Sequence, residues 1–109
     1  MTLHVNLYAT FRLHAGVKTF TIDLPQGSTL LAAIHAIAAK YPVLAPQWLD
    51  ENGALRTHVH CFVNDHEFLT LAEGVATPLV DGDTLDFFPP VAGGQSASAG
   101  SQYRFSMYW

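Results

Sequence analysis

The sequence predicts an α+β fold in which one long helix packs on one face of a mixed sheet. Two stretches near the N-terminus alternate apolar and polar residues, a stretch with helical spacing follows, and strand-like segments return in the second half. A period of two marks a half-buried strand, whereas spacings of three and four mark one face of a helix. At 109 residues, half of them hydrophobic, the chain is long enough for one domain with a modest core.

The first two strands are predicted at residues 3–11 and 17–24. Leu3, Val5 and Leu7 share one face of the first stretch, and the second alternates again with one slip of phase. A short connection containing a glycine turn joins the two stretches. Two alternating runs joined in this way predict an antiparallel hairpin.

The helix is predicted between Ser28 and Pro42. Its apolar residues are spaced four, three and four apart, which places them on one helical face: Leu30, Ile34, Ile37 and Tyr41. Ser28 or Thr29 can cap the amides at its start, and Pro42 ends it.

The second half predicts a short helical turn near Trp48, a strand over residues 58–65, a loop over 67–83 and a last strand over 84–91. Pro89 and Pro90 stop that strand, because proline donates no ladder hydrogen bond. The last strand is nearly all apolar, so we expect it in the centre of the sheet, beside the first strand.

A hairpin, a crossover helix and a final strand inserted beside the first describe the β-grasp arrangement. We expect residues 1–94 to form this domain and residues 95–109 to form a flexible linker with an aromatic tail. The helix should pack on the inner faces of the strands, in a core that contains Leu30, Ile34, Ile37, Val5, Leu7, Val59, Val63 and Leu85.

Composition and charge exclude several classes of function. The net charge is −4 with only five Lys and Arg residues, a poor footprint for nucleic acid. No apolar run approaches the roughly 20 residues that span a bilayer. The first ten residues lack the pattern of a signal peptide, so we expect a soluble cytoplasmic protein. An acidic body suits a protein partner with a basic surface.

The residues that could carry chemistry show no convincing catalytic or metal site. Cys61 alternates in phase with Val59 and Val63, so we expect an inert core thiol. His58 and His60 share a strand face but lack a third ligand at suitable spacing. The aspartates at 81, 83 and 86 are interpreted as turn and solvent-face residues.

Five segments in order along the chain resemble the small subunit of molybdopterin synthase, within the family of ubiquitin-like sulfur carriers. They are residues 9–16, 24–30, 60–65, 77–83 and, above all, "FFPPVAGG" at 87–94. A lone Gly-Gly is a weak signal, whereas this proline-containing arm after a Gly-Asp turn is specific. Carriers of the thiamin pathway are shorter and lack the Pro-Pro arm, so that branch is the less favoured.

The resemblance implies that the protein acts through its own carbonyl group. In such carriers a ubiquitin-activating-type enzyme uses ATP to adenylate the carboxylate of the last glycine, here Gly94, and sulfur displaces AMP to leave a thiocarboxylate. A larger synthase subunit or another sulfur acceptor then receives the arm. Gly93 and Gly94 lack a Cβ, which suits passage through a narrow channel. No tightly bound cofactor is implied.

The resemblance also implies which residues contact the partner. Tyr8, Arg12 and Phe88 match positions that the family uses for this purpose, together with the arm residues Pro89, Pro90, Val91 and Ala92. The alternative interpretation is a strand-face aromatic beside a solvated arginine.

The sequence departs from the family after Gly94, which is joined to Gln95 by a peptide bond. An amide carbonyl offers no carboxylate for adenylation. One explanation is a precursor that a peptidase cleaves at the Gly94–Gln95 junction. A retained tail used for binding or assembly is the second, and an appended foreign segment is the third.

The end of the chain alternates again, with its apolar side chains on one face: Tyr103, Phe105, Met107 and Trp109. Such a segment could dock on a sheet edge or in an aromatic pocket. We expect it to be extended and docked on a protein surface, preferentially between molecules, so that the protein self-associates. The alternative is a disordered end.

The sequence is therefore compatible with three functions. The favoured one is a sulfur carrier for molybdenum cofactor biosynthesis, made as a precursor and activated at Gly94. A ubiquitin-like modifier, conjugated through Gly94 to lysines of other proteins, would use the same activation chemistry. An interaction module that retains its tail would use none of it.

Overall fold

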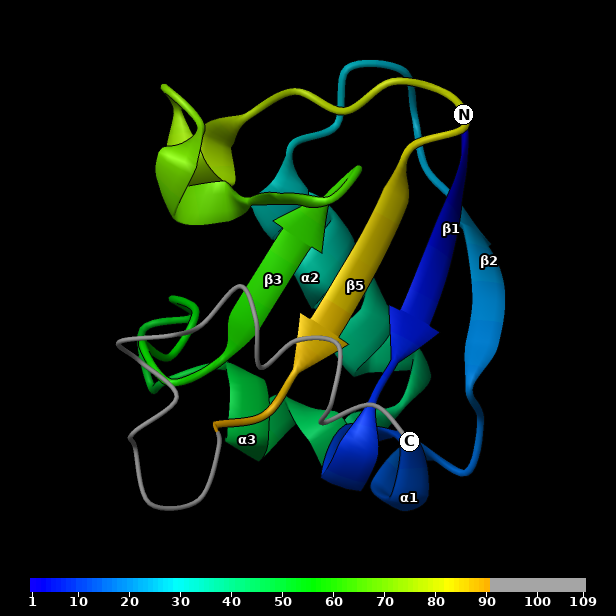
Figure 1. The fold of residues 1–109 in the computed structure, drawn as a ribbon, viewed down its shortest axis with the longest axis vertical. Helices are drawn as coiled ribbons and strands as arrows, with labels where there is room; N and C mark the ends of the chain where they lie inside the picture. Colours follow the sequence, from blue (N-terminus) through cyan, green and yellow to red (C-terminus); the bar gives the residue numbers. More distant parts are fainter. Residues whose placement is uncertain (91–109) are drawn as a thin grey trace.

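The computed structural model describes residues 1–90, and the fold is a five-stranded mixed sheet with its main helix on one face (Figure 1). The sheet order is β2-β1-β5-β3-β4. The strands are β1 Thr2–Leu7, β2 Thr19–Asp23, β3 His60–Val63, β4 His66–Glu67 and β5 Thr84–Phe88. This arrangement confirms the predicted α+β, β-grasp fold.

Strands β1 and β5 form the centre of the sheet and run parallel, with Val5 opposite Leu85 and Leu7 opposite Phe87. Strand β2 pairs antiparallel with β1, and β3 pairs antiparallel with β5. The predicted hairpin pairing and the predicted insertion of the last strand beside the first are therefore both confirmed. Because β1 and β5 are parallel, their carboxyl ends lie at the same edge of the sheet.

The connection between β1 and β2 differs from the prediction. Residues 9–11 were expected to continue the first strand, but they begin the helix α1, Ala9–Ala15. Phe11 is buried in the core, and Gly16 ends the helix in the left-handed region at φ 76°, where its amide donates to the carbonyl of Arg12. Phe11 lies four residues after Leu7, a spacing that fits both a strand and a helix, so periodicity alone could not separate them.

Helix α2, Leu30–Lys40, lies behind the sheet in the view of Figure 1. Thr29 is its N-cap, with its hydroxyl accepting a hydrogen bond from the Ala32 amide at 3.2 Å. The buried cluster contains the predicted core residues, with Leu30, Ile34 and Ile37 on the helix, and Val5, Leu7, Val59, Val63 and Leu85 from the sheet side. The predicted apolar face of the helix is confirmed.

Short helical segments complete the described chain. The 3-10 helix η1, Pro42–Leu44, leads into α3, Ala45–Trp48, which confirms the helical turn expected near Trp48. Two further 3-10 turns, η2 Phe68–Thr70 and η3 Gly74–Ala76, lie in the long loop before β5. Within residues 1–90 no helix has the length and apolar character to cross a membrane.

Candidate functional site at the root of the C-terminal arm

The predicted arm leaves the sheet at the end of β5, on the side of the sheet where the parallel strand β1 also ends (Figure 1). Pro89 is buried and Pro90 is exposed at this point. Residues 91–109 lie outside the described part of the chain. Nine predicted site residues therefore remain predictions: Val91, Ala92, Gly93, Gly94 and Gln95 of the arm and its junction, and Tyr103, Phe105, Met107 and Trp109 of the tail.

Tyr8 and Phe88, two of the predicted partner-binding residues, meet at this end of the sheet. The rings of Tyr8 and Phe88 stack with their centroids 4.2 Å apart and an angle of 24° between their planes. Phe62 packs edge-on against Phe88, with centroids 5.5 Å apart. Tyr8, Phe62 and Phe88 form what we call the aromatic cluster, and it lies on the face of the sheet opposite α2.

Strand register explains why these three rings meet. Phe87 lies opposite Leu7 and Cys61 and faces the core, so the next residue on β5, Phe88, points to the other face of the sheet. Tyr8 follows Leu7 and lies beside Phe88, and its amide donates to the Phe87 carbonyl at 3.2 Å. Phe88 is buried, whereas Tyr8 and Phe62 are half-buried.

Phe62 was not among the predicted site residues. It alternates in phase with His58 and His60, on the polar side of the predicted strand, and an aromatic residue at such a position was the available signal. Its contact with Phe88 depends on the pairing of β3 with β5, which the pattern of a single strand does not reveal.

The aspartates around β5 differ from the prediction. Asp83 and Asp86 are buried and are not solvent-face residues. Asp83 accepts hydrogen bonds from the Asn64 side-chain amide at 2.8 Å and from the Val80 amide at 2.9 Å, which fixes the turn into β5. Asp86 accepts a bond from the side-chain amide of Asn6 at 2.7 Å across the two central strands. Both carboxylates are acceptable in a buried setting because they are hydrogen-bonded.

The electrostatic environment keeps the Tyr8 hydroxyl protonated. Partial burial raises the pKa of Tyr8 above its ordinary value, and the carboxylates of Asp86 and Asp65 raise this pKa further. The hydroxyl therefore stays neutral at physiological pH and can serve as a hydrogen-bond donor or acceptor.

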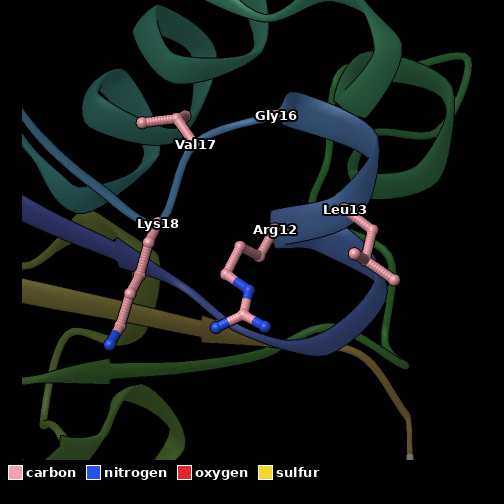
Figure 2. A pocket seen from close by; sticks show the side chains of 5 residues that line it. All are labelled: Arg12, Leu13, Gly16, Val17 and Lys18. Atoms are coloured by element: carbon pink, nitrogen blue, oxygen red, sulfur yellow. The ribbon is translucent and has the colours of Figure 1, made fainter.

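Arg12, another predicted partner-binding residue, lies on α1 and belongs to a separate surface feature. It lines a shallow depression together with Leu13, Gly16, Val17 and Lys18 (Figure 2). The side chains of Arg12 and Lys18 extend to the same side of this depression (Figure 2). Two cations therefore gather on one surface of a chain whose net charge is −4. Such a pair suits an acidic patch on a partner.

Cys61 is fully buried on β3, as predicted for a core thiol. Burial raises the pKa of the Cys61 thiol far above its ordinary value, and the carboxylate of Asp86 adds to the effect. Because the thiolate is the nucleophile, this thiol is chemically inert. Within residues 1–90 no three His, Cys, Asp or Glu side chains gather closely enough to hold a metal ion.

Comparison with known proteins assigns the family. The model of the ThiS family matches residues 5–94, so the chain belongs to this family of ubiquitin-like sulfur carriers. Small archaeal modifier protein 3 of Haloferax volcanii is 37% identical over 94 residues, which cover 86% of this chain and all of the relative. Sulfur carrier protein CysO of Mycobacterium tuberculosis is 31% identical over 96 residues, with the same coverage of both chains.

Solved structures agree with this assignment. SAMP1 from Haloferax volcanii is 26% identical, with a TM-score of 0.77 over 86% of this chain and all of that chain. The Amycolatopsis orientalis BexX/CysO complex contains a chain that is 25% identical, with a TM-score of 0.66 over 84% of this chain and 99% of that chain. The two curated relatives and SAMP1 are matched over their whole length, and the family match in this chain ends at Gly94.

Proposed function

We propose that the protein is a sulfur carrier made as a precursor, whose Gly94 carboxylate becomes the reactive group after residues 95–109 are removed. The observation that carries this proposal is the position of the family match, which ends at the second glycine of "PPVAGG". The resemblance of residues 87–94 to the arm of the molybdopterin synthase small subunit supports it.

The proposed chemistry needs a free carboxylate. A processing peptidase hydrolyses the peptide bond between Gly94 and Gln95. An oxygen of the Gly94 carboxylate then attacks the α-phosphorus of ATP on an activating enzyme, and pyrophosphate leaves. Sulfide (HS⁻) attacks the carbonyl carbon of the resulting acyl adenylate, the bond to AMP breaks, AMP departs, and a thiocarboxylate remains. ATP is thus a substrate of the activating enzyme and not a resident cofactor of this chain.

The described residues would position the arm and present it to partners. The central strand β5 and Pro89 hold the root of the arm, which lowers the entropy lost when the arm enters another active site. Tyr8 and Phe88 offer an aromatic surface beside that root, and Arg12 with Lys18 offers positive charge. An activating enzyme and a larger sulfur acceptor are the partners that we propose, in the cytoplasm. The BexX/CysO complex shows a relative together with a partner protein.

The acceptor that best fits the resemblance is the large subunit of molybdopterin synthase. A second function is favoured by one specific observation, the 37% identity to a small archaeal modifier protein. In that case Gly94 would form an isopeptide bond with lysines of other proteins. Both functions require the same adenylation at Gly94, and they separate at the step that consumes the activated acyl group.

Adenylation tests the proposal directly. A chain that ends at Gly94 should form an acyl adenylate with a cognate activating enzyme and ATP, measured as exchange of labelled pyrophosphate into ATP. The 109-residue chain should give only background exchange, because its Gly94 carbonyl is an amide. In the shorter chain Gly94→Ala should reduce charging or transfer at least about tenfold, since the added methyl restricts backbone angles in the arm. Equal exchange by the two chain lengths would refute the precursor proposal.

A further inference from the structure

Strand β2, Thr19–Asp23, forms one edge of the sheet, and no strand within residues 1–90 pairs with its outer side (Figure 1). The opposite edge of the sheet is β4, which is only two residues long. A very short edge strand is one of the means by which proteins avoid pairing with another chain. Strand β4 has this protection and the five-residue strand β2 does not.

The ladder between β1 and β2 shows which backbone groups of β2 point outward. The Leu7 amide donates to the Lys18 carbonyl at 2.8 Å, and hydrogen-bonded pairs alternate with non-bonded pairs in an antiparallel ladder. In the observed register the even-numbered residues of β2 therefore bond to β1. The backbone amides and carbonyls of Thr19, Thr21 and Asp23 point away from β1, and no residue of the described chain pairs with them.

The sequence of β2, "TFTID", lacks the devices that usually block an edge strand. Such devices are proline, a bulge and a charged side chain that points inward. The strand contains no proline, and its register with β1 runs over five consecutive pairs without a bulge. Its one charged side chain, Asp23, is exposed and accepts a hydrogen bond from the Thr2 hydroxyl at 2.7 Å. Threonine, phenylalanine and isoleucine all favour strand pairing.

The edge is complementary to itself when two copies run antiparallel with Thr21 opposite Thr21. The outward backbone groups then meet, and Thr19 lies opposite Asp23 of the second copy at each end. On the side that faces α2, Phe20 lies opposite Ile22 of the second copy. Aromatic and β-branched pairs across strands are stabilising, and no like charges are directly opposed.

Charge favours this antiparallel arrangement over a parallel one. Lys18 precedes the strand and Asp23 ends it, and both side chains are exposed. Antiparallel pairing brings the basic start of one strand to the acidic end of the other. Parallel pairing would place like charges together.

We propose that β2 is a self-association site, at which two copies of the chain pair antiparallel about a twofold axis at Thr21. The two sheets then join into one sheet of about ten strands, a size that open sheets reach. The interface is isologous, because the same strand is used by both copies. It consists mainly of one short ladder, so the dimer is weak and depends on concentration.

The proposed dimer leaves the root of the arm accessible. Strand β1 separates β2 from β5, which carries the arm. Because the two copies run antiparallel, their arms leave the joined sheet at opposite ends. Self-association through β2 is therefore compatible with partner binding at both arms.

A pair of matched lysine variants of the full chain tests the register. Thr19 and Thr21 are both exposed on β2, and either lysine changes the net charge equally. Thr21→Lys places two like charges opposite each other at the axis and should raise the dissociation constant of the dimer at least about fivefold. Thr19→Lys places its charge opposite Asp23 of the second copy and should not raise it. Sedimentation equilibrium between about 10 µM and about 500 µM measures both constants.

Mixing two variants provides a positive test of the same axis. Thr21→Lys and Thr21→Asp should each associate weakly alone, whereas an equimolar mixture should recover at least the association of the unmodified protein. Circular dichroism checks that each variant is folded. A mixture that associates no better than its components would overturn the proposed register.

Hydrogen exchange locates the interface at single residues. The outward amides of Thr19, Thr21 and Asp23 should exchange at least about twofold more slowly at about 500 µM than at about 10 µM. The amides of Phe20 and Ile22, which bond to β1, should not change. A monomer at all concentrations, an equal effect of the two lysine variants, or outward amides that ignore concentration would each overturn the proposal.

The test also separates β2 pairing from assembly through the tail and from the proposed function. Phe105→Ser with Trp109→Ser should leave the dissociation constant unchanged, and loss of the dimer in this variant would overturn pairing through β2. All these measurements omit ATP and the activating enzyme. Monomers that are still adenylated at Gly94 would remove the dimer and keep the carrier, whereas dimers without adenylation would do the reverse.

Discussion

Tyr8 shows how a single residue of the arm root links stability to pH. Its pKa is raised by partial burial first and by Asp86 and Asp65 second. Because the pKa is higher in the folded state than in the unfolded state, Tyr8 contributes stability that is fully present below about pH 10. This contribution is lost as the pH rises through the folded-state value.

The variant Tyr8→Phe should therefore weaken the loss of stability at alkaline pH. Urea unfolding measured at pH 9 and at pH 11 should show a smaller difference between the two pH values in the variant than in the unmodified protein. Tyr41→Phe is the matched control, since it removes a hydroxyl from a ring that packs on Phe20 away from the arm. An unchanged pH difference in Tyr8→Phe would contradict the raised pKa of Tyr8 in the folded state.

The burial of Asp83 and Asp86 could not be predicted from the sequence around them. Aspartates in "DGD" and "LDF" are typical of turns and solvent faces, so the sequence favoured exposure for Asp83 and Asp86. The structure buries both because Asn64, in the turn after β3, and Asn6, on β1, donate hydrogen bonds to them. Such partners are 19 and 80 residues distant along the chain, and a local pattern cannot reveal them.

Helix α2 is the element that completes the core, and Ile34 is its fully buried centre. Ile34→Ala should cost about 2–5 kcal/mol of unfolding free energy, because it removes apolar contacts and leaves a cavity. Chemical denaturation followed by circular dichroism measures this loss. Ala39→Ser, at an exposed position of the same helix, should change the free energy by less than about 0.5 kcal/mol. A similarly small effect for Ile34→Ala would place the apolar face of the helix elsewhere.

The elements differ in how well their patterns predict them. Helix α2 was predictable because its apolar spacing, its Thr29 cap and its Pro42 stop agree with one another. Strand β5 was predictable as central because it is mostly apolar, with Leu85, Phe87 and Phe88 among its five residues. Helix α1 was not predictable from the pattern. Phe11 continues the strand-like alternation of Leu3, Val5 and Leu7, but it also lies one helical turn after Leu7. Only the tertiary burial of Phe11 beneath α3 resolves this ambiguity, with its ring 5.5 Å from that of Trp48.

At the scale of the whole molecule, the described residues form the support and the root of the arm, and its reactive end lies beyond them. The fold places the root of the arm, an aromatic cluster and two cations at one end of the sheet. The role of the arm as a reactive group was predictable, because it follows from the motif "FFPPVAGG" in the sequence itself. The contribution of Phe62 to the aromatic cluster was not predictable, because it depends on the pairing of β3 with β5.

The intact mass of the protein isolated from its native cells tests the central claim most directly. We expect a chain that ends at Gly94, partly with one carboxylate oxygen replaced by sulfur. Mass spectrometry under conditions that preserve thiocarboxylates measures both features together. A population that carries all 109 residues and no sulfur at Gly94, in cells where sulfur transfer is active, would contradict the account and would favour an interaction module that keeps its tail.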